Sequence, residues 1–287
     1  MKSTKWVILN LQFWSSIVDI ILNFLVIPYL IIPVPSGIPL GILTTIGVSP
    51  LVQSYFIVTG SCTVGAALVV FFENRYNILV IGPYRSKYRN PCRLILLVLL
   101  YLYTLAFPIP LYWIMPDQST GKEFALMKVP CLPLEIYNDP NFFTVNTKVA
   151  YFRTTLTISI LLATVPSLYF IGTSIRQIYS FNPISTYTKN CQMRFFLALC
   201  IQAIVPIFII LIPHAYMLYS FKTGYYDQGM NNIVEILSSC HGLVSTIVML
   251  SIHKPYRNAV RQLFRLKTTE EHSVLQYTTT TISRSMV

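Results

Sequence analysis

The chain has 287 residues, of which 54% are hydrophobic and only 11% charged, and its formal net charge is +11. Soluble domains carry about 25% charged residues, so this composition excludes a chain that faces water over most of its surface. A strongly basic chain often binds nucleic acid. Here the basic residues are confined to a few loops, so we expect no nucleic-acid partner.

Six segments are long and apolar enough to cross a bilayer, which takes about 20 residues. In chain order they are Trp6–Ile32, Leu51–Phe72, Leu94–Met115, Ala150–Gly172, Phe195–Leu218 and Ile233–Ile252. Backbone polar groups in lipid must be satisfied within the segment, so we expect each to be one helix, with internal prolines such as Pro28 tolerated as kinks. The predicted fold is an all-α membrane protein whose transmembrane bundle covers residues 1–252.

The distribution of Lys and Arg predicts the orientation of this bundle. Summed over alternate loops and tails, sixteen basic residues lie on one side and four on the other, leaving out Arg153 within a span. The side that is rich in Lys and Arg faces the cytoplasm. Both termini are therefore expected to be cytoplasmic.

Two further segments follow the last span. Residues 253–267 combine apolar and basic positions at helical spacing, which predicts an amphipathic juxtamembrane helix lying on an anionic lipid leaflet. Residues 268–287 are rich in Ser and Thr and offer few apolar side chains for a core. They are expected to form a disordered cytoplasmic tail.

Motifs of common enzymes are absent from the sequence. It has no dinucleotide or P-loop glycine pattern, no HExxH and no GxSxG. The spacing of its Cys and His residues does not fit a metal site. We expect no enzyme activity, no cofactor and no metal, which leaves a receptor and a transporter of a small solute as the two main classes.

Asp19 and His241 are ionisable residues expected inside the membrane. Asp19 lies about 20 Å into the first span, and His241 lies about 16 Å from the cytoplasmic end of the last span. The two side chains are expected to meet within the bundle as a polar switch, since intramembrane ionisable groups are candidates for function. The alternative is a purely structural interhelical hydrogen bond, worth about 0.6 kcal/mol.

Polar residues also lie toward the predicted outer ends of the last two spans. His214, Tyr216 and Glu235, together with His241 deeper in the bundle, are candidate ligand-binding residues around an outward-opening cavity. The alternative is that the outer residues are interfacial side chains that reach water.

The second span ends in the segment "FFENRYN", with Glu73, Arg75 and Tyr76 at the predicted cytoplasmic border. Glu73 could hold Arg75 in a local ion pair that a conformational change releases. The alternative is an interfacial anchor, because aromatic and basic residues are common at that depth.

Four blocks of sequence together resemble the nematode serpentine receptors of class H (Srh). They are "HGLVSTIVMLSIHKPYRNAV" at 241–260, "FFENRYN" at 71–77, "VPCLP" at 129–133 and the first thirty residues. The resemblance covers nearly the whole chain. It implies a seven-transmembrane bundle like that of G-protein-coupled receptors, in which the six spans found here correspond to helices two to seven.

The first helix of that family has no counterpart in this sequence. We expect either a truncated or divergent copy of such a receptor, or a sequence that was read from a late start codon. A chain without this helix could also be a nonfunctional relict of the family.

The resemblance implies a chemosensory receptor that detects a small environmental molecule and signals to a heterotrimeric G protein. It implies a place in the cell membrane, in the cilia of sensory neurons. Position and resemblance together suggest a set of residues for coupling to the G protein: Glu73, Arg75, Tyr76, Pro255, Tyr256 and Arg257.

Overall fold

The structure is a computed structural model that describes residues 2–79, 89–180, 186–252 and 256–262. The chain divides into two compact units, Met1–Ser245 and Thr246–Val287. The described residues of the second unit, 246–252 and 256–262, are all helical. Pro255 and the predicted tail, residues 268–287, lie outside the described residues.

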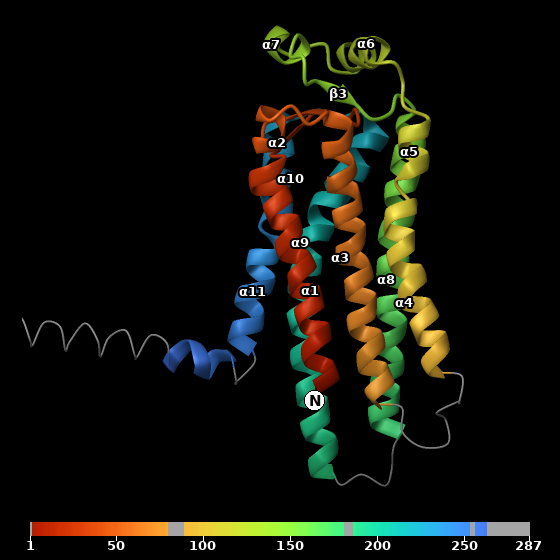
Figure 1. The fold of residues 1–287 in the computed structure, drawn as a ribbon, viewed down its shortest axis with the longest axis vertical. Helices are drawn as coiled ribbons and strands as arrows, with labels where there is room; N and C mark the ends of the chain where they lie inside the picture. Colours follow the sequence, from red (N-terminus) through yellow and green to blue (C-terminus); the bar gives the residue numbers. More distant parts are fainter. Residues whose placement is uncertain (1, 80–88, 181–185, 253–255, 263–287) are drawn as a thin grey trace, which may run out of the picture. The chain divides into compact units, whose positions relative to one another are not determined.

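Helices form most of the described chain (Figure 1). The long ones are α1 (Lys2–Ile20), which continues as the π-helix η1 (Ile21–Leu25), α3 (Pro50–Leu79), α4 (Arg89–Ala106), α8 (Val149–Ser180), α9 (Thr186–Thr223), α10 (Gln228–Ser239) and α11 (His241–Ile252). The short ones are α2 (Ile42–Thr45), α5 (Ile109–Trp113), α6 (Gln118–Lys128) and α7 (Leu134–Tyr137). Each of the six predicted spans therefore coincides with helix over most of its length.

Four of the described helical segments are long and apolar enough to cross a membrane, or five if α10 and α11 together count as one broken span. In α9 the described residues contribute two shorter apolar stretches, Asn190–Ile201 and Ile207–Thr223. The helical membrane fold agrees with the sequence. The count of six spans stays a prediction.

The first predicted span, Trp6–Ile32, is helical only as far as Leu25. Ile27 takes a left-handed backbone conformation (φ 45°), which is rare for a β-branched residue and turns the chain out of the helix. Strand β1 (Pro28–Leu30) follows directly. The prediction of helix over residues 26–32, with Pro28 as a kink inside it, is therefore wrong.

A small antiparallel sheet lies at one end of the first unit, the end that the basic residues predict to be extracellular (Figure 1). Strand β2 (Ser36–Pro39) pairs with β1 on one side and with β3 (Phe143–Thr144) on the other. The sheet and the α6 region enclose a core of buried apolar side chains: Ile31, Val34, Ile38, Ala125, Val129, Leu132 and Phe142. Two loops far apart in sequence thus form one folded cap.

Prolines interrupt the third predicted span. Helix α4 ends at Ala106, and α5 begins after Pro108 with Pro110 in its first turn. Proline lacks a backbone N–H and is tolerated in a first turn, where that group has no intrahelical partner. Residues 91–113 nevertheless remain long and apolar enough for a span.

The last predicted span, Ile233–Ile252, is broken at Cys240, which separates α10 from α11. The backbone N–H of Cys240 donates to the carbonyls of Ile236 and Leu237, which closes the end of α10. One continuous helix was expected here, so that expectation is wrong at Cys240. The break falls immediately before His241.

Helix α3 is the centre of the bundle and packs against α1, α4 and α8. Two glycines allow this close packing. A Cβ atom added to Gly60 would lie 3.0 Å from Val18 of α1, and one added to Gly65 would lie 3.0 Å from Ala163 of α8. Small residues at helix contacts let the backbones approach in membrane proteins. Residues 66–75 of α3, which follow Gly65, are accordingly buried.

Candidate functional site

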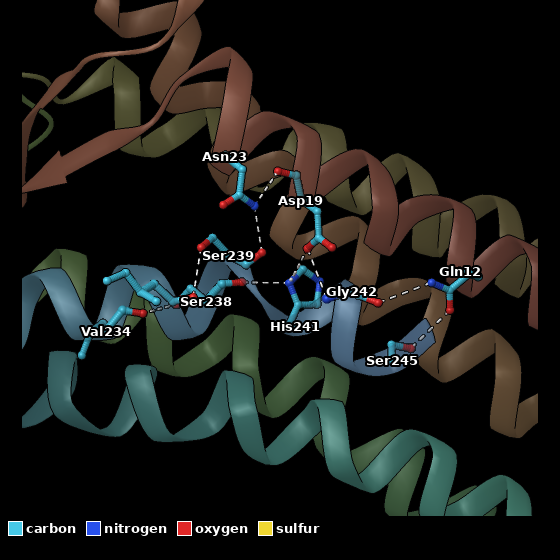
Figure 2. A network of polar contacts seen from close by, with 10 residues as sticks. Gln12, Asp19, Asn23, Val234, Ser238, Ser239, His241, Gly242 and Ser245 are labelled. Carbon is cyan, nitrogen blue, oxygen red and sulfur yellow. Dashed lines mark hydrogen bonds and ion pairs between the residues drawn. The ribbon is translucent and has the colours of Figure 1, made fainter. Parts of the chain in front are cut away.

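Asp19 and His241, which the sequence placed at similar depths, are in contact. Oδ1 of Asp19 lies 3.2 Å from Nδ1 of His241 and also accepts a hydrogen bond of 3.2 Å from the backbone N–H of Gly242 (Figure 2). The His241 side chain is 3% exposed and that of Asp19 21% exposed. The contact joins α1 to the first residues of α11.

Gly242 makes this close contact possible. A Cβ atom at this position would lie 2.3 Å from Oδ2 of Asp19 and 2.9 Å from Oδ1. No side chain fits there unless the carboxylate moves. The absence of a side chain at position 242 is therefore part of the geometry that holds Asp19.

Further hydrogen bonds tie α1 and η1 to the broken helix on either side of this contact (Figure 2). Nδ2 of Asn23 donates to the carbonyls of Asp19 and Ser239, both at 2.9 Å. In the other direction along α1, Ser245 Oγ donates to Gln12 Oε1 at 3.4 Å. The carbonyl of Ser239 is available to Asn23 because helix α10 ends there.

The two ring nitrogens of His241 have different surroundings. Nδ1 lies 2.8 Å from the carbonyl oxygen of Ser238 and 3.2 Å from Asp19 Oδ1. Both neighbours are acceptors, so the ring hydrogen is assigned to Nδ1. Nε2 is buried and has no hydrogen-bond partner among the residues that the structure describes. A buried polar atom without a partner calls for a specific explanation.

His241 also lines a cavity of about 600 Å³ within the first unit. Small-molecule sites typically have volumes of about 300–1,000 Å³. Residues of α1, α3, α4, α8, α9, α10, α11 and the sheet line the cavity, and most of them are apolar. Three predicted ligand-binding residues, His214, Glu235 and His241, line it together.

Tyr216, the fourth predicted ligand-binding residue, lies outside the lining of this cavity. Its hydroxyl donates to Oδ1 of Asn231 at 3.0 Å, and Asn231 in turn donates to the carbonyl of Ile32. Tyr216 thereby ties α9 to α10 and, through Asn231, to the loop after β1. The expectation of a ligand contact at this residue gains no support from its position.

The predicted cytoplasmic end of α3 carries a second polar contact. Glu73 forms an ion pair with Arg93 of α4, with 2.7 Å between Oε2 and Nε. Nη2 of Arg93 also donates to Oδ1 of Asn74 at 2.7 Å. The local pair with Arg75 was expected from the sequence, but the partner that the structure gives Glu73 is Arg93.

The remaining residues suggested for G-protein coupling lie in different surroundings. Arg75 is buried at 7% exposure, and the ring of Tyr76 packs against Phe170 of α8, with 5.7 Å between ring centroids. In the second unit Tyr256 and Arg257 belong to the helical stretch 256–262, and Arg257 donates to the carbonyl of Ser251 at 3.3 Å.

Sequence reasoning missed two residues that complete these contacts. Arg93 was counted only as a loop charge that sets orientation, yet it is the partner of both Glu73 and Asn74. Gly242 was not singled out, although it follows His241 directly. A glycine beside an intramembrane histidine could have suggested that another group approaches there.

The residues of the site can form hydrogen bonds and ion pairs with a ligand. Among the residues that the structure describes, no group of three or more His, Cys, Asp or Glu is arranged to hold a metal ion. The ionisable groups at or beside the cavity instead occur singly, as for Glu235 and His214, or as the pair of Asp19 and His241.

Comparisons with known proteins indicate the family to which a chain with this cavity belongs. The family model described as "Serpentine type 7TM GPCR chemoreceptor Srh" matches residues 1–266. Serpentine receptor class H-72 of Caenorhabditis elegans is 27% identical over 270 residues, which cover 92% of this chain and 76% of that protein. No solved structure matches the chain.

Proposed function

The chain belongs to the Srh family of serpentine chemoreceptors, as its sequence blocks predicted, and on that premise we propose that it detects a small environmental molecule and signals to a heterotrimeric G protein. It is a multi-pass membrane protein of a receptor family. The ligand would bind in the cavity, and the site of action would be the cell membrane of sensory neurons, in their cilia.

The observation that carries the proposal is the position of His241 between the cavity and α1. One ring nitrogen faces Asp19 and Ser238, and the other is buried without a partner in a residue that lines the cavity. A ligand that bonds to Nε2 changes the charge or tautomer that His241 favours and thereby changes its bond with Asp19. Ligand binding is in this way linked to the contact between α1 and α11.

A ligand shifts such an equilibrium only as far as it binds the two states differently. The proposed joint of this change is the break at Cys240, where α10 ends and α11 begins. In the proposed mechanism the ligand favours the state in which the Asp19–His241 contact is altered. The predicted cytoplasmic end, with Glu73, Arg75 and Tyr76, would then present a different surface to the G protein.

The proposed coupling is tested by Arg75→Ala and Arg257→Ala, with signalling measured as ligand-evoked second-messenger change at matched surface levels. Coupling between sites typically changes affinity by about 5- to 150-fold, so each variant is expected to need roughly tenfold more ligand for the same response. Arg153→Ala, in α8 near the opposite end of the bundle, is the matched control.

Normal signalling by both variants would contradict the coupling role of these residues. Arg75→Lys accompanies Arg75→Ala, because a buried arginine removed outright can prevent folding and the lysine keeps the positive charge. Pro255 and Tyr256 belong to the same proposed coupling region and are tested in the same assay.

The transporter reading rests on the same ionisable residues at and beside the cavity, Asp19, Glu235 and His241. It requires solute flux through the membrane coupled to protons. Uptake that depends on a proton gradient and is abolished by Asp19→Asn would favour it. Ligand-dependent activation of a G protein without flux would favour the receptor.

A further inference from the structure

The charged and polar groups around the cavity differ in what they offer a ligand. None of its described lining residues is Lys or Arg, whereas Glu235, His214 and His241 all contribute to the lining. A ligand with a carboxylate or phosphate group would therefore meet no permanent positive charge there. The same lining suits a ligand that brings hydrogen-bond donors or a positive charge of its own.

Glu235 is the acidic group of this set. Its Oε1 atom is buried and makes no hydrogen bond within the described part of the chain. Glu235 takes part in neither the ion pair of Arg93 with Glu73 nor the contact of His241 with Asp19. Burial of an unpaired carboxylate in an apolar site is unfavourable, so this group requires either a proton or a cation.

In their neutral form His214 and His241 each leave one ring nitrogen, Nε2, as a hydrogen-bond acceptor. Nδ1 of His214 lies 2.7 Å from the carbonyl of Ile210, which assigns the ring hydrogen to Nδ1 and leaves a lone pair on Nε2. His241 has the same assignment through Ser238 and Asp19.

The rest of the lining fits an apolar molecular body. Helices α3, α8 and α9 contribute aliphatic side chains to it, among them Ile57, Leu156, Ile160, Ile207 and Leu211. The volume of about 600 Å³ falls in the range of sites that enclose small molecules. Such sites are mostly apolar and carry a small number of polar groups that fix the orientation of the ligand.

We propose that the ligand is a small, mostly apolar amine whose ammonium group pairs with the carboxylate of Glu235. A neutral amine can take the proton of a protonated Glu235, and an ammonium ion can meet an ionised one. Both routes end in the same ion pair and need no other reactant. This assignment rests on the proposed receptor function, which it extends by naming the class of ligand.

The test uses the purified full-length chain in lipid nanodiscs and sets of compounds with one carbon skeleton each. The first set is phenethylamine, phenethyl alcohol and phenylacetate, and further sets vary the alkyl or aryl body. Binding is measured as a shift in the thermal unfolding midpoint and as a dissociation constant. The amines are expected to bind at least roughly thirtyfold more tightly than the matched alcohols, as for a buried charge pair.

Glu235→Gln keeps the shape of the side chain and should remove this preference, whereas Glu235→Asp should retain it in part. Glu123→Gln, on the exposed face of α6, is the matched control and should bind the amines like the unaltered chain. Equal binding of alcohol and amine, preferred binding of the carboxylate, no stabilisation by any amine, or an unchanged preference in Glu235→Gln would each overturn the proposal.

The readout needs no G protein, so the two proposals fail separately. A chain that signals but shows no amine preference loses only the assignment of the ligand class. A chain that binds amines through Glu235 but activates no G protein loses only the signalling function.

Discussion

Two buried polar contacts in the first unit can be compared directly, one between Asp19 and His241 and one between Glu73 and Arg93. Each pairs a fully buried side chain with a partly exposed one: His241 with Asp19, and Glu73 with Arg93. Burial therefore does not distinguish them. The difference lies in the elements that they join and in the bonding that they leave open.

The Glu73–Arg93 contact joins consecutive helices and is well satisfied. Arg93 donates to Glu73 and to Asn74, both at 2.7 Å. The Asp19–His241 contact joins α1 to α11 at 3.2 Å and leaves Nε2 of His241 without a partner. A pair whose hydrogen bonds are all formed holds its two helices in one arrangement. A longer contact, with an unbonded ring nitrogen in a residue that lines a cavity, can respond to a ligand.

The largest effect is expected from Gly242→Val, which places a branched side chain where Asp19 now lies. Even a Cβ atom would be 2.3 Å from Oδ2, so the carboxylate must move and its bonds to His241 and Gly242 are lost. We expect a loss of about 3 kcal/mol in the free energy of unfolding, from overpacking together with the broken pair. The measurement is denaturant or thermal unfolding in detergent.

Gly172→Val in α8 is the matched control for this variant, because a Cβ atom at Gly172 would meet nothing within 4 Å. Its effect is expected to stay within about 0.5 kcal/mol. Equal destabilisation by the two variants would mean that the close approach of Asp19 to Gly242 does not contribute to stability.

A smaller effect is expected from Asp19→Asn, which keeps the shape of the side chain and removes its charge. The amide oxygen can still accept from Gly242 and from Nδ1–H of His241, but the hydrogen bonds to a charged carboxylate become weaker bonds to a neutral amide. We expect a loss of about 1–2 kcal/mol, the range for a buried group left with a poorer partner. Unfolding of the purified chain measures it, and Asp117→Asn, at an exposed loop position, serves as the control.

The same variant also tests whether the Asp19–His241 contact is responsive. If ligand binding acts through His241, then Asp19→Asn should change the ligand concentration needed for half-maximal response. A variant that is less stable yet responds to ligand like the unaltered chain would reduce this contact to a structural bond.

The length of the apolar segments was sufficient to predict the long helices but not the places where they end. The apolar run Trp6–Ile32 looks uniform in composition, although the chain leaves the helix after Leu25 to join a sheet with β2. That pairing depends on β2 and β3, which lie in segments that read as loops. A pairing between distant segments leaves no periodic signal in any one of them.

The parts of the candidate site that could be predicted are those whose signal lies within a single segment of the sequence. The depths of Asp19 and His241, counted along their own helices, were enough to predict their contact. The partner of Glu73 was missed because Arg93 belongs to the next helix, whereas Arg75 lies two residues away on the same helix. The break at Cys240 carries no proline or other signal in the sequence, so the backbone carbonyls that it frees could not be foreseen.

The smallest effect is expected from the Glu73–Arg93 pair, measured as a double-mutant cycle. Glu73→Gln, Arg93→Gln and the double variant give a coupling energy of about 0.5–1 kcal/mol, because Arg93 is partly exposed and exposed ion pairs contribute little. Ligand should leave this coupling unchanged if the pair only holds α3 against α4. If ligand weakened this coupling energy, the Glu73–Arg93 pair would be the contact that responds to ligand. The proposed switch would then lie at this end of the bundle and not at Asp19 and His241.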